Sequence, residues 1–122
     1  MLLNNFFYID HLSHLENNIQ ADIRIQQDHE IFKGHFPQQP IVPGVCVMEM
    51  MKEVLQEALT KKLMLTNSAF TKFLAILSPK ETTIAQLVID YTLLDDQKIN
   101  VNATLKHAST IYFKFKGQFT VK

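Results

Sequence analysis

Four stretches of the chain alternate regularly between apolar and polar residues. They cover residues 19–26, 86–93, 99–106 and 111–122. A period of two residues is typical of a β-strand that buries one face and exposes the other. The last three stretches are separated only by short polar connections, at 95–97 and 107–109. We therefore expect these three strands to form an antiparallel meander.

Two further strands are predicted from weaker patterns. One covers Phe6 to Ile9, and the other runs from about Ala69 to Leu77, after which Pro79 ends it. Gly117 falls on the apolar face of the last strand. A glycine inside a strand indicates a β-bulge or the close approach of another backbone.

The pattern changes to a helical period between about Val45 and Lys61. Apolar residues there form one wide face, made of Val47, Met48, Met51, Val54, Leu55, Ala58 and Leu59. The first two turns are apolar on all sides, so we expect this end of the helix to be deeply buried. One long helix and about six antiparallel strands predict an α+β fold in which the sheet curls around the helix.

The composition narrows the classes of function. The chain has 122 residues, which fits a single domain over residues 1–122. Twelve basic residues balance twelve acidic ones, so no net charge favours nucleic acid or a membrane surface. No apolar run is long enough to span a bilayer, and the first residues lack the features of a signal peptide. With Cys46 as its single cysteine, the protein is expected in a reducing compartment, the cytoplasm.

The segment from Gly34 to Gly44 differs from the rest of the chain. It holds three of the four prolines and two of the three glycines around one histidine, His35. Prolines fix the backbone, so such a segment can hold an imidazole in a defined position. Imidazole titrates near neutral pH and suits a general base. Glu49 follows inside the apolar start of the helix, where burial raises the pKa of an unpaired carboxyl. A surface glutamate paired with Lys52 is the alternative.

A known family shares this arrangement of residues. The chain resembles the FabZ-type 3-hydroxyacyl-[acyl carrier protein] dehydratases, which carry G-H-F-P-x-x-P-x-x-P-G-V and then a glutamate. The motif here runs from Gly34 to Val45, and Glu49 has the family's spacing of five residues from Gly44. The resemblance implies a hotdog fold, in which an antiparallel sheet wraps around one central helix. It implies a hydro-lyase that converts a 3-hydroxyacyl thioester into a trans-2-enoyl thioester, in fatty-acid or specialised acyl synthesis.

The resemblance also implies partners and roles. The partners are an acyl carrier protein bearing a 3-hydroxyacyl chain and a second copy of the chain, as a homodimer or a larger assembly of dimers, with no cofactor. His35 is then the base that removes the C2 proton, and Glu49 handles the C3 hydroxyl. Backbone N–H groups of Gly44 and Val45, at the positive end of the helix, would hold the thioester oxygen. A simple helix cap is compatible with that role.

Other candidate residues carry weaker expectations. An acyl tunnel has five candidate lining residues, for which core packing is the alternative: Phe36, Met48, Met51, Phe70 and Phe73. Lysines 33, 72 and 80 are candidates for contact with an acidic carrier protein, against a simple role as solvated charges. Cys46 is expected to be a small buried apolar residue rather than a nucleophile. His11, His14 and Glu16 resemble metal ligands only in type, so no metal site is expected.

Three departures from the family pattern leave alternatives open. The chain begins almost at the family's first strand, and Ser78-Pro79-Lys80 replaces the usual Pro-Gly-Asp. Glu53 stands where the family often has glutamine, and it is either a second acid near the site or a residue of the helix surface. Thioester hydrolysis and non-catalytic binding of an acyl chain or carrier protein are the two other functions considered. Isomerising relatives carry aspartate at the position of Glu49, so simple dehydration is expected.

Overall fold

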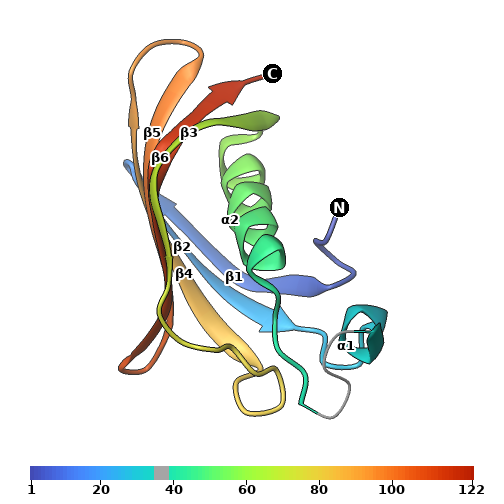
Figure 1. Cartoon of the computed structure of the whole chain (residues 1–122). Helices are drawn as coiled ribbons and strands as arrows, with labels where there is room; N and C mark the ends of the chain where they lie inside the picture. Colours follow the sequence, from blue (N-terminus) through green and yellow to red (C-terminus); the bar gives the residue numbers. More distant parts are fainter. Residues whose placement is uncertain (35–38) are drawn as a thin grey trace.

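The computed structural model describes residues 1–34 and 39–122. In these residues a curled antiparallel sheet holds a helix against its concave face, as Figure 1 shows. The elements follow in the order β1 (Phe7–Leu15), β2 (Asn18–Ile25), α1 (Glu30–Gly34), α2 (Gly44–Leu59), β3 (Leu63–Phe73), β4 (Ile84–Leu93), β5 (Lys98–His107) and β6 (Thr110–Val121). The predicted fold class, an α+β hotdog fold, is confirmed.

The strands lie in the order β1-β2-β4-β5-β6-β3. β4, β5 and β6 are consecutive antiparallel neighbours, so the predicted meander is confirmed. β3 crosses over and pairs antiparallel with β6. It therefore occupies one edge of the sheet, and β1 occupies the other.

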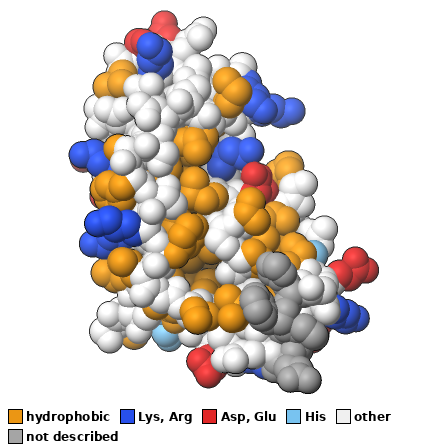
Figure 2. All heavy atoms as spheres, in the orientation of Figure 1, with side chains coloured by type: hydrophobic (Ala, Val, Ile, Leu, Met, Phe, Trp, Pro, Cys, Tyr) orange, Lys and Arg blue, Asp and Glu red, His pale blue; other side chains and the backbone are white. Residues whose placement is uncertain are grey.

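The apolar positions of the alternating stretches form the inner face of the sheet. Along β2, every second residue from Ile19 to Ile25 is buried, and β5 repeats this pattern from Ile99 to Leu105. Helix α2 covers this face with its own buried residues: Cys46, Val47, Met50, Met51, Val54 and Leu55. In Figure 2 hydrophobic side chains also reach the surface between the sheet and the helix.

The predicted helix is observed as α2, within two residues at either end. Thr60 ends it in the left-handed conformation, with φ 55°, and donates its backbone N–H to the carbonyl of Gln56. The expectation that the first turns are deeply buried is wrong for Val45, whose side of the helix faces outward and which is 76% exposed. No helix in the described ranges is both long and apolar enough to cross a membrane.

Three elements differ from the expectations: two strands have other bounds, and one short helix was not expected. β3 begins at Leu63 and ends at Phe73, whereas the sequence pattern placed a strand at 69–77. Most of β3 is exposed and its pairing with β6 shifts register twice, so it has no regular alternation. β1 extends to Leu15, well beyond Ile9. The short helix α1 was not expected, because five residues contain too few turns for a helical period.

Gly117 lies where another backbone comes very close, as its position on an apolar face predicted. A Cβ atom there would overlap the carbonyl oxygen of Asn67 on β3 and would be 2.5 Å from the Phe115 ring. Register shifts flank this point on β3, between Leu65 and Asn67 and between Ser68 and Phe70. Only glycine leaves room for β3 to pair with β6 here.

Candidate active site

The start of α2 presents backbone N–H donors that have no acceptor within the helix. Pro43 precedes the helix with an extended backbone, and its carbonyl accepts hydrogen bonds from the N–H groups of Cys46 and Val47. Gly44 and Val45 occupy the first two helical positions, where an N–H group has no intrahelical acceptor. These two donors and the helix dipole favour negative charge at this point. This arrangement is chemically suited to binding an oxyanion, the role that the family resemblance implies for these two residues.

Gly44 packs directly beneath Phe73 at the end of β3. A Cβ atom on Gly44 would be 2.9 Å from the tip of the Phe73 ring, which is itself 52% exposed and packs against Phe113. Gly44 and Phe73 share a mostly apolar pocket of about 220 Å³, hereafter the Phe73 pocket, with Ile41, Val42, Val47 and Ile76. A hydrogen bond joins two parts of the lining of the Phe73 pocket: the Val42 N–H, in the loop before α2, donates to the Leu77 carbonyl at 2.9 Å.

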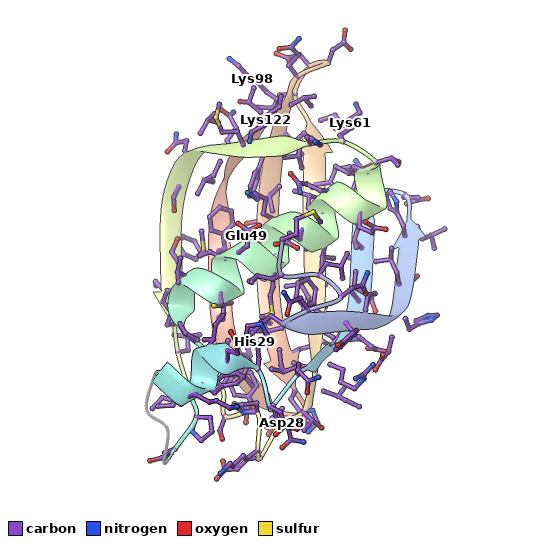
Figure 3. All side chains as sticks on the ribbon, turned by 90° about the vertical axis from the view of Figure 1, so that its right-hand side faces the viewer. Asp28, His29, Glu49, Lys61, Lys98 and Lys122 are labelled. Atoms are coloured by element: carbon purple, nitrogen blue, oxygen red, sulfur yellow. The ribbon has the colours of Figure 1, made fainter. Side chains whose placement is uncertain are left out.

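Glu49 lies in a second pocket, on the exposed side of α2. This Glu49 pocket has a volume of about 210 Å³ and is bounded by α2, β3 and the end of β6. Its walls are largely apolar, from Val45, Met48, Met51, Leu63, Met64 and Phe119. Lys52 and Lys122 add positive charge. In Figure 3 the helix crosses in front of the sheet and carries Glu49 near the middle of the view.

The environment of Glu49 favours the protonated carboxyl. Burial, and then the nearby carboxylate of Glu53, raise the pKa of Glu49, while Lys52 opposes this shift. The Lys52 ammonium lies 3.2 Å from Oε1 of Glu49, and the Glu49 side chain is 36% exposed. Both readings of Glu49 from the sequence therefore hold in part: it pairs with Lys52, and it also faces a largely apolar pocket with its pKa raised.

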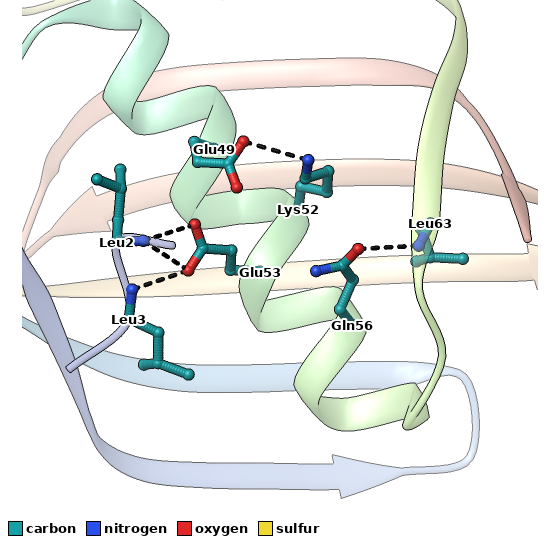
Figure 4. Close-up of polar contacts among 7 residues, drawn as sticks. All are labelled: Leu2, Leu3, Glu49, Lys52, Glu53, Gln56 and Leu63. Atoms are coloured by element: carbon teal, nitrogen blue, oxygen red, sulfur yellow. Dashed lines mark hydrogen bonds and ion pairs between the residues drawn. The ribbon is translucent and has the colours of Figure 1, made fainter. Parts of the chain in front are cut away.

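Glu53 is a buried acid one helical turn beyond Glu49. Its side chain is 1% exposed, so it is not a residue of the helix surface. The carboxylate accepts backbone hydrogen bonds from Leu2, at 2.9 and 3.0 Å, and from Leu3, at 2.8 Å (Figure 4). Burial alone would raise the pKa of Glu53, but Glu49, the two N–H donors and the charge of the N-terminus outweigh it and hold the pKa below its usual value.

The remaining predicted residues are dispersed. His35 and Phe36 lie outside the described residues. Met48 and Met51 line the Glu49 pocket, whereas Phe73 lines the Phe73 pocket. Phe70 lies on β3 with the Lys72 ammonium 5.3 Å from its ring, and it lines neither of these two pockets.

Cys46 is buried, as the sequence predicts. Burial, and then the charge of Glu49, raise the pKa of its thiol. Among residues 1–34 and 39–122, no group of three or more His, Cys, Asp or Glu side chains is placed to hold a metal ion.

One residue with a structural role near the motif was not singled out from the sequence. His29 accepts the backbone N–H of Ile31 on Nδ1 at 3.0 Å, and its Nε2 lies 2.9 Å from the Asn5 side-chain oxygen. Because Nδ1 is an acceptor, Nε2 carries the proton and donates to Asn5. His29 thereby caps α1, which leads into the proline-rich segment. Its position just before Glu30 is the only signal of this cap in the sequence.

Comparison with protein families places these features in context. A family model described as ApeI-like, ApeI dehydratase, matches residues 11–118. A 3-hydroxyacyl-[acyl-carrier-protein] dehydratase FabZ of Rickettsia canadensis is 30% identical over 99 residues, which are 75% of this chain and 62% of the relative. A FabZ of Lactococcus lactis is 36% identical over 55 residues, covering 45% of this chain and 35% of that relative. The chain thus spans less than two thirds of the length of either.

Solved structures show the same fold at low sequence identity. One is the dehydratase heterocomplex ApeI:P from Xenorhabdus doucetiae, with a TM-score of 0.72 and 18% identity over 92% of this chain and 96% of that one. A thioesterase from Staphylococcus aureus has a TM-score of 0.66 and 9% identity, covering 95% and 93% of the two chains. At these low sequence identities, the similarity to either structure is a similarity of fold alone.

Proposed function

Because this chain belongs to the ApeI-like dehydratase family, we propose that it removes water from a 3-hydroxyacyl thioester to form a trans-2-enoyl thioester. One observation carries this proposal. In the first turns of α2, an acid whose pKa is raised, Glu49, lies in a largely apolar pocket that Val45 also lines, and Val45 follows Gly44 at the helix start, where the N–H groups have no intrahelical acceptors. That combination suits a reaction in which a hydroxyl must be protonated while charge develops on a carbonyl oxygen.

The proposed reaction assigns one step to each group. His35 takes the proton from C2, and the electron pair of that C–H bond forms the C2=C3 double bond. The C3–O bond breaks as Glu49 gives its proton to the hydroxyl, which leaves as water. The N–H groups of Gly44 and Val45 hold the thioester oxygen while it carries negative charge. Proton exchange with solvent then restores His35 and Glu49.

The proposed partners are an acyl carrier protein, which delivers the thioester, and a second hotdog subunit. The exposed apolar residues at one flank of the chain support a second subunit: Val45, Phe73, Leu74 and Ile76. β3 is an edge strand beside that flank, and uncovered strand edges favour pairing with another chain. The partner is a second copy of this chain or a related one, since a solved relative is described as a heterocomplex.

Turnover of a thioester tests the proposal directly. The protein is mixed with a 3-hydroxyacyl or a 2-enoyl thioester on a carrier protein, and their interconversion is followed by mass spectrometry. We expect His35→Ala to lower kcat by about 10²- to 10⁴-fold, the usual contribution of a general base. His107→Ala is the matched control, because His107 is exposed at the end of β5.

Two results would contradict the proposal. A folded wild-type protein that leaves the thioester unchanged is not a dehydratase, and binding of the acyl carrier without turnover would favour the non-catalytic function. Release of a free thiol would instead identify a thioesterase. Full activity in His35→Ala would remove His35 from the mechanism.

A further inference from the structure

We propose that Glu53 is a positioning residue that keeps the candidate acid Glu49 protonated while it holds residues 2–7 against α2. The inference deepens the proposed function, and its importance for catalysis rests on that function. It assigns a role to Glu53, the buried acid of the described ranges, whose carboxylate is held by backbone hydrogen bonds and lies within the field of the N-terminal ammonium.

The burial of Glu53 requires a structural reason. A carboxylate removed from water is unfavourable unless hydrogen bonds replace its hydration. Three hydrogen bonds from the Leu2 and Leu3 N–H groups do so here, between positions 50 and 51 residues apart. A charged acceptor is favoured over a neutral one by such donors. The site therefore stabilises Glu53 as the anion.

The donors are held in place by a tight turn. The carbonyl of Leu2 accepts the N–H groups of Asn5, Phe6 and Phe7, and Asn4 has a positive φ of 66°. Phe6 and Phe7 are fully buried, so this turn is fixed to the core. Leu2 and Leu3 consequently present their N–H groups to Glu53 from a rigid backbone.

An anion held at Glu53 acts on its neighbour. Residues four apart on a helix lie on the same face, and Figure 4 shows the Glu49 and Glu53 carboxyls on adjacent turns. An anion on one of two neighbouring carboxyls raises the pKa of the other. The hydrogen bonds from Leu2 and Leu3 decide which carboxyl is the more readily ionised, because they favour the charged form of Glu53. Of the two acids, Glu49, the residue that faces the pocket, is therefore the one that is protonated more readily.

The other groups around Glu49 are few. On α2 they are the Lys52 ammonium, which favours ionised Glu49, and the Cys46 thiol. Lys122, the residue after β6, lines the pocket, and β3 contributes only the apolar side chains of Leu63, Met64 and Leu65. Among these described groups, Glu53 alone is an anion that opposes the ionisation of Glu49.

The experiment is a titration of the Glu49 side-chain carboxyl by ¹³C NMR in three variants of the full chain. Glu53→Gln retains an acceptor for Leu2 and Leu3 but removes the charge, so Glu49 should titrate at lower pH than in the wild type. Lys52→Gln leaves Glu53 intact and should move the titration to higher pH. Glu57→Gln is the matched control, because Glu57 is exposed on the same helix and should leave the titration unchanged.

The pH profile of kcat gives the second readout. An acid acts while it is protonated, so activity falls as the pH rises through its pKa. Glu53→Gln should move this alkaline limb to lower pH, with a tenfold loss on its alkaline side for each pH unit of displacement. A merely structural role would lower kcat evenly across the pH range.

The outcomes separate the two proposals. If Glu49 titrates at the same pH in the wild type and in folded Glu53→Gln, the role of Glu53 is wrong. If Glu53→Gln does not fold, the wild-type titration decides, because a Glu49 carboxyl that titrates at or below the ordinary pH of a glutamate overturns the electrostatic argument. The titration needs no turnover, so an inactive wild-type protein would reject the dehydratase and still leave the inference on Glu53 to be judged by NMR.

Discussion

Two glycines in this chain, Gly44 at the start of α2 and Gly117 in the sheet, both have close neighbours, but of very different kinds. A Cβ atom on Gly44 would meet the tip of the half-exposed Phe73 ring, which can move. A Cβ atom on Gly117 would meet a backbone carbonyl of β3, which cannot move without breaking the pairing. The contrast teaches that a side chain can move aside to make room at the start of α2. Between β3 and β6, the paired backbones leave no such freedom. Changes in the first region should affect activity, and changes in the second should affect stability.

The largest effect should come from Glu49→Gln. The amide cannot give a proton to a leaving hydroxyl, so we expect kcat for the thioester to fall by about 10²- to 10⁴-fold. The partly exposed pair with Lys52 contributes little to folding, so the free energy of unfolding should change by less than about 1 kcal/mol. Steady-state kinetics and urea unfolding measure the two quantities on the same samples. A variant with more than half of the wild-type kcat would separate Glu49 from the chemistry.

A smaller effect, on stability alone, is expected for Gly117→Ala. The new methyl group would overlap the Asn67 carbonyl and the Phe115 ring, and overpacking of this kind costs about 1–3 kcal/mol. Urea unfolding should show the loss. Gly34→Ala makes the same chemical change where a Cβ meets no atom of the described residues within 4 Å, so it controls for the substitution itself. Equal stability of the two variants would contradict the fixed geometry of the β3–β6 edge.

The smallest effect is expected for Gly44→Ala. The Phe73 ring must turn aside, but alanine favours the helix by up to about 1 kcal/mol over glycine. The two terms offset each other, and the free energy of unfolding should change by less than about 1 kcal/mol. The same substitution in a Phe73→Ala background should be stabilising, because the ring is gone. If Gly44→Ala in the Phe73→Ala background lowered the free energy of unfolding as much as Gly117→Ala does, the two regions would not differ in the way proposed.

The sheet and the main helix could be predicted because their residues repeat. Alternation along β2, β4, β5 and β6 reflects burial of one face, and that pattern is present in the sequence itself. β3 could not be delimited, because its side chains are mostly exposed and its register shifts twice. An exposed edge strand buries neither face, so its sequence shows no regular alternation of apolar and polar residues.

The site was predicted only as far as its local motif. The spacing of Gly44 and Glu49 is visible in the sequence, and so is the unusual acid at Glu53. The partners of Glu53 are not visible, because Leu2 and Leu3 are about fifty residues away and use backbone atoms that every residue has. Long-range contacts through the backbone have no signature in residue type. The structure was needed to show that Glu53 is buried and what its carboxylate binds.

The place of β3 in the sheet has a consequence for how the protein is made. During synthesis the residues of β3 emerge well before those of β6, the only strand with which β3 pairs in the described sheet. Pairing between segments so distant in the chain is slow, because a large loop must close first. The Glu49 pocket draws its walls from α2, β3 and β6. It can therefore close only after the ribosome has delivered the last strand, and the nascent chain carries an unfinished pocket until then.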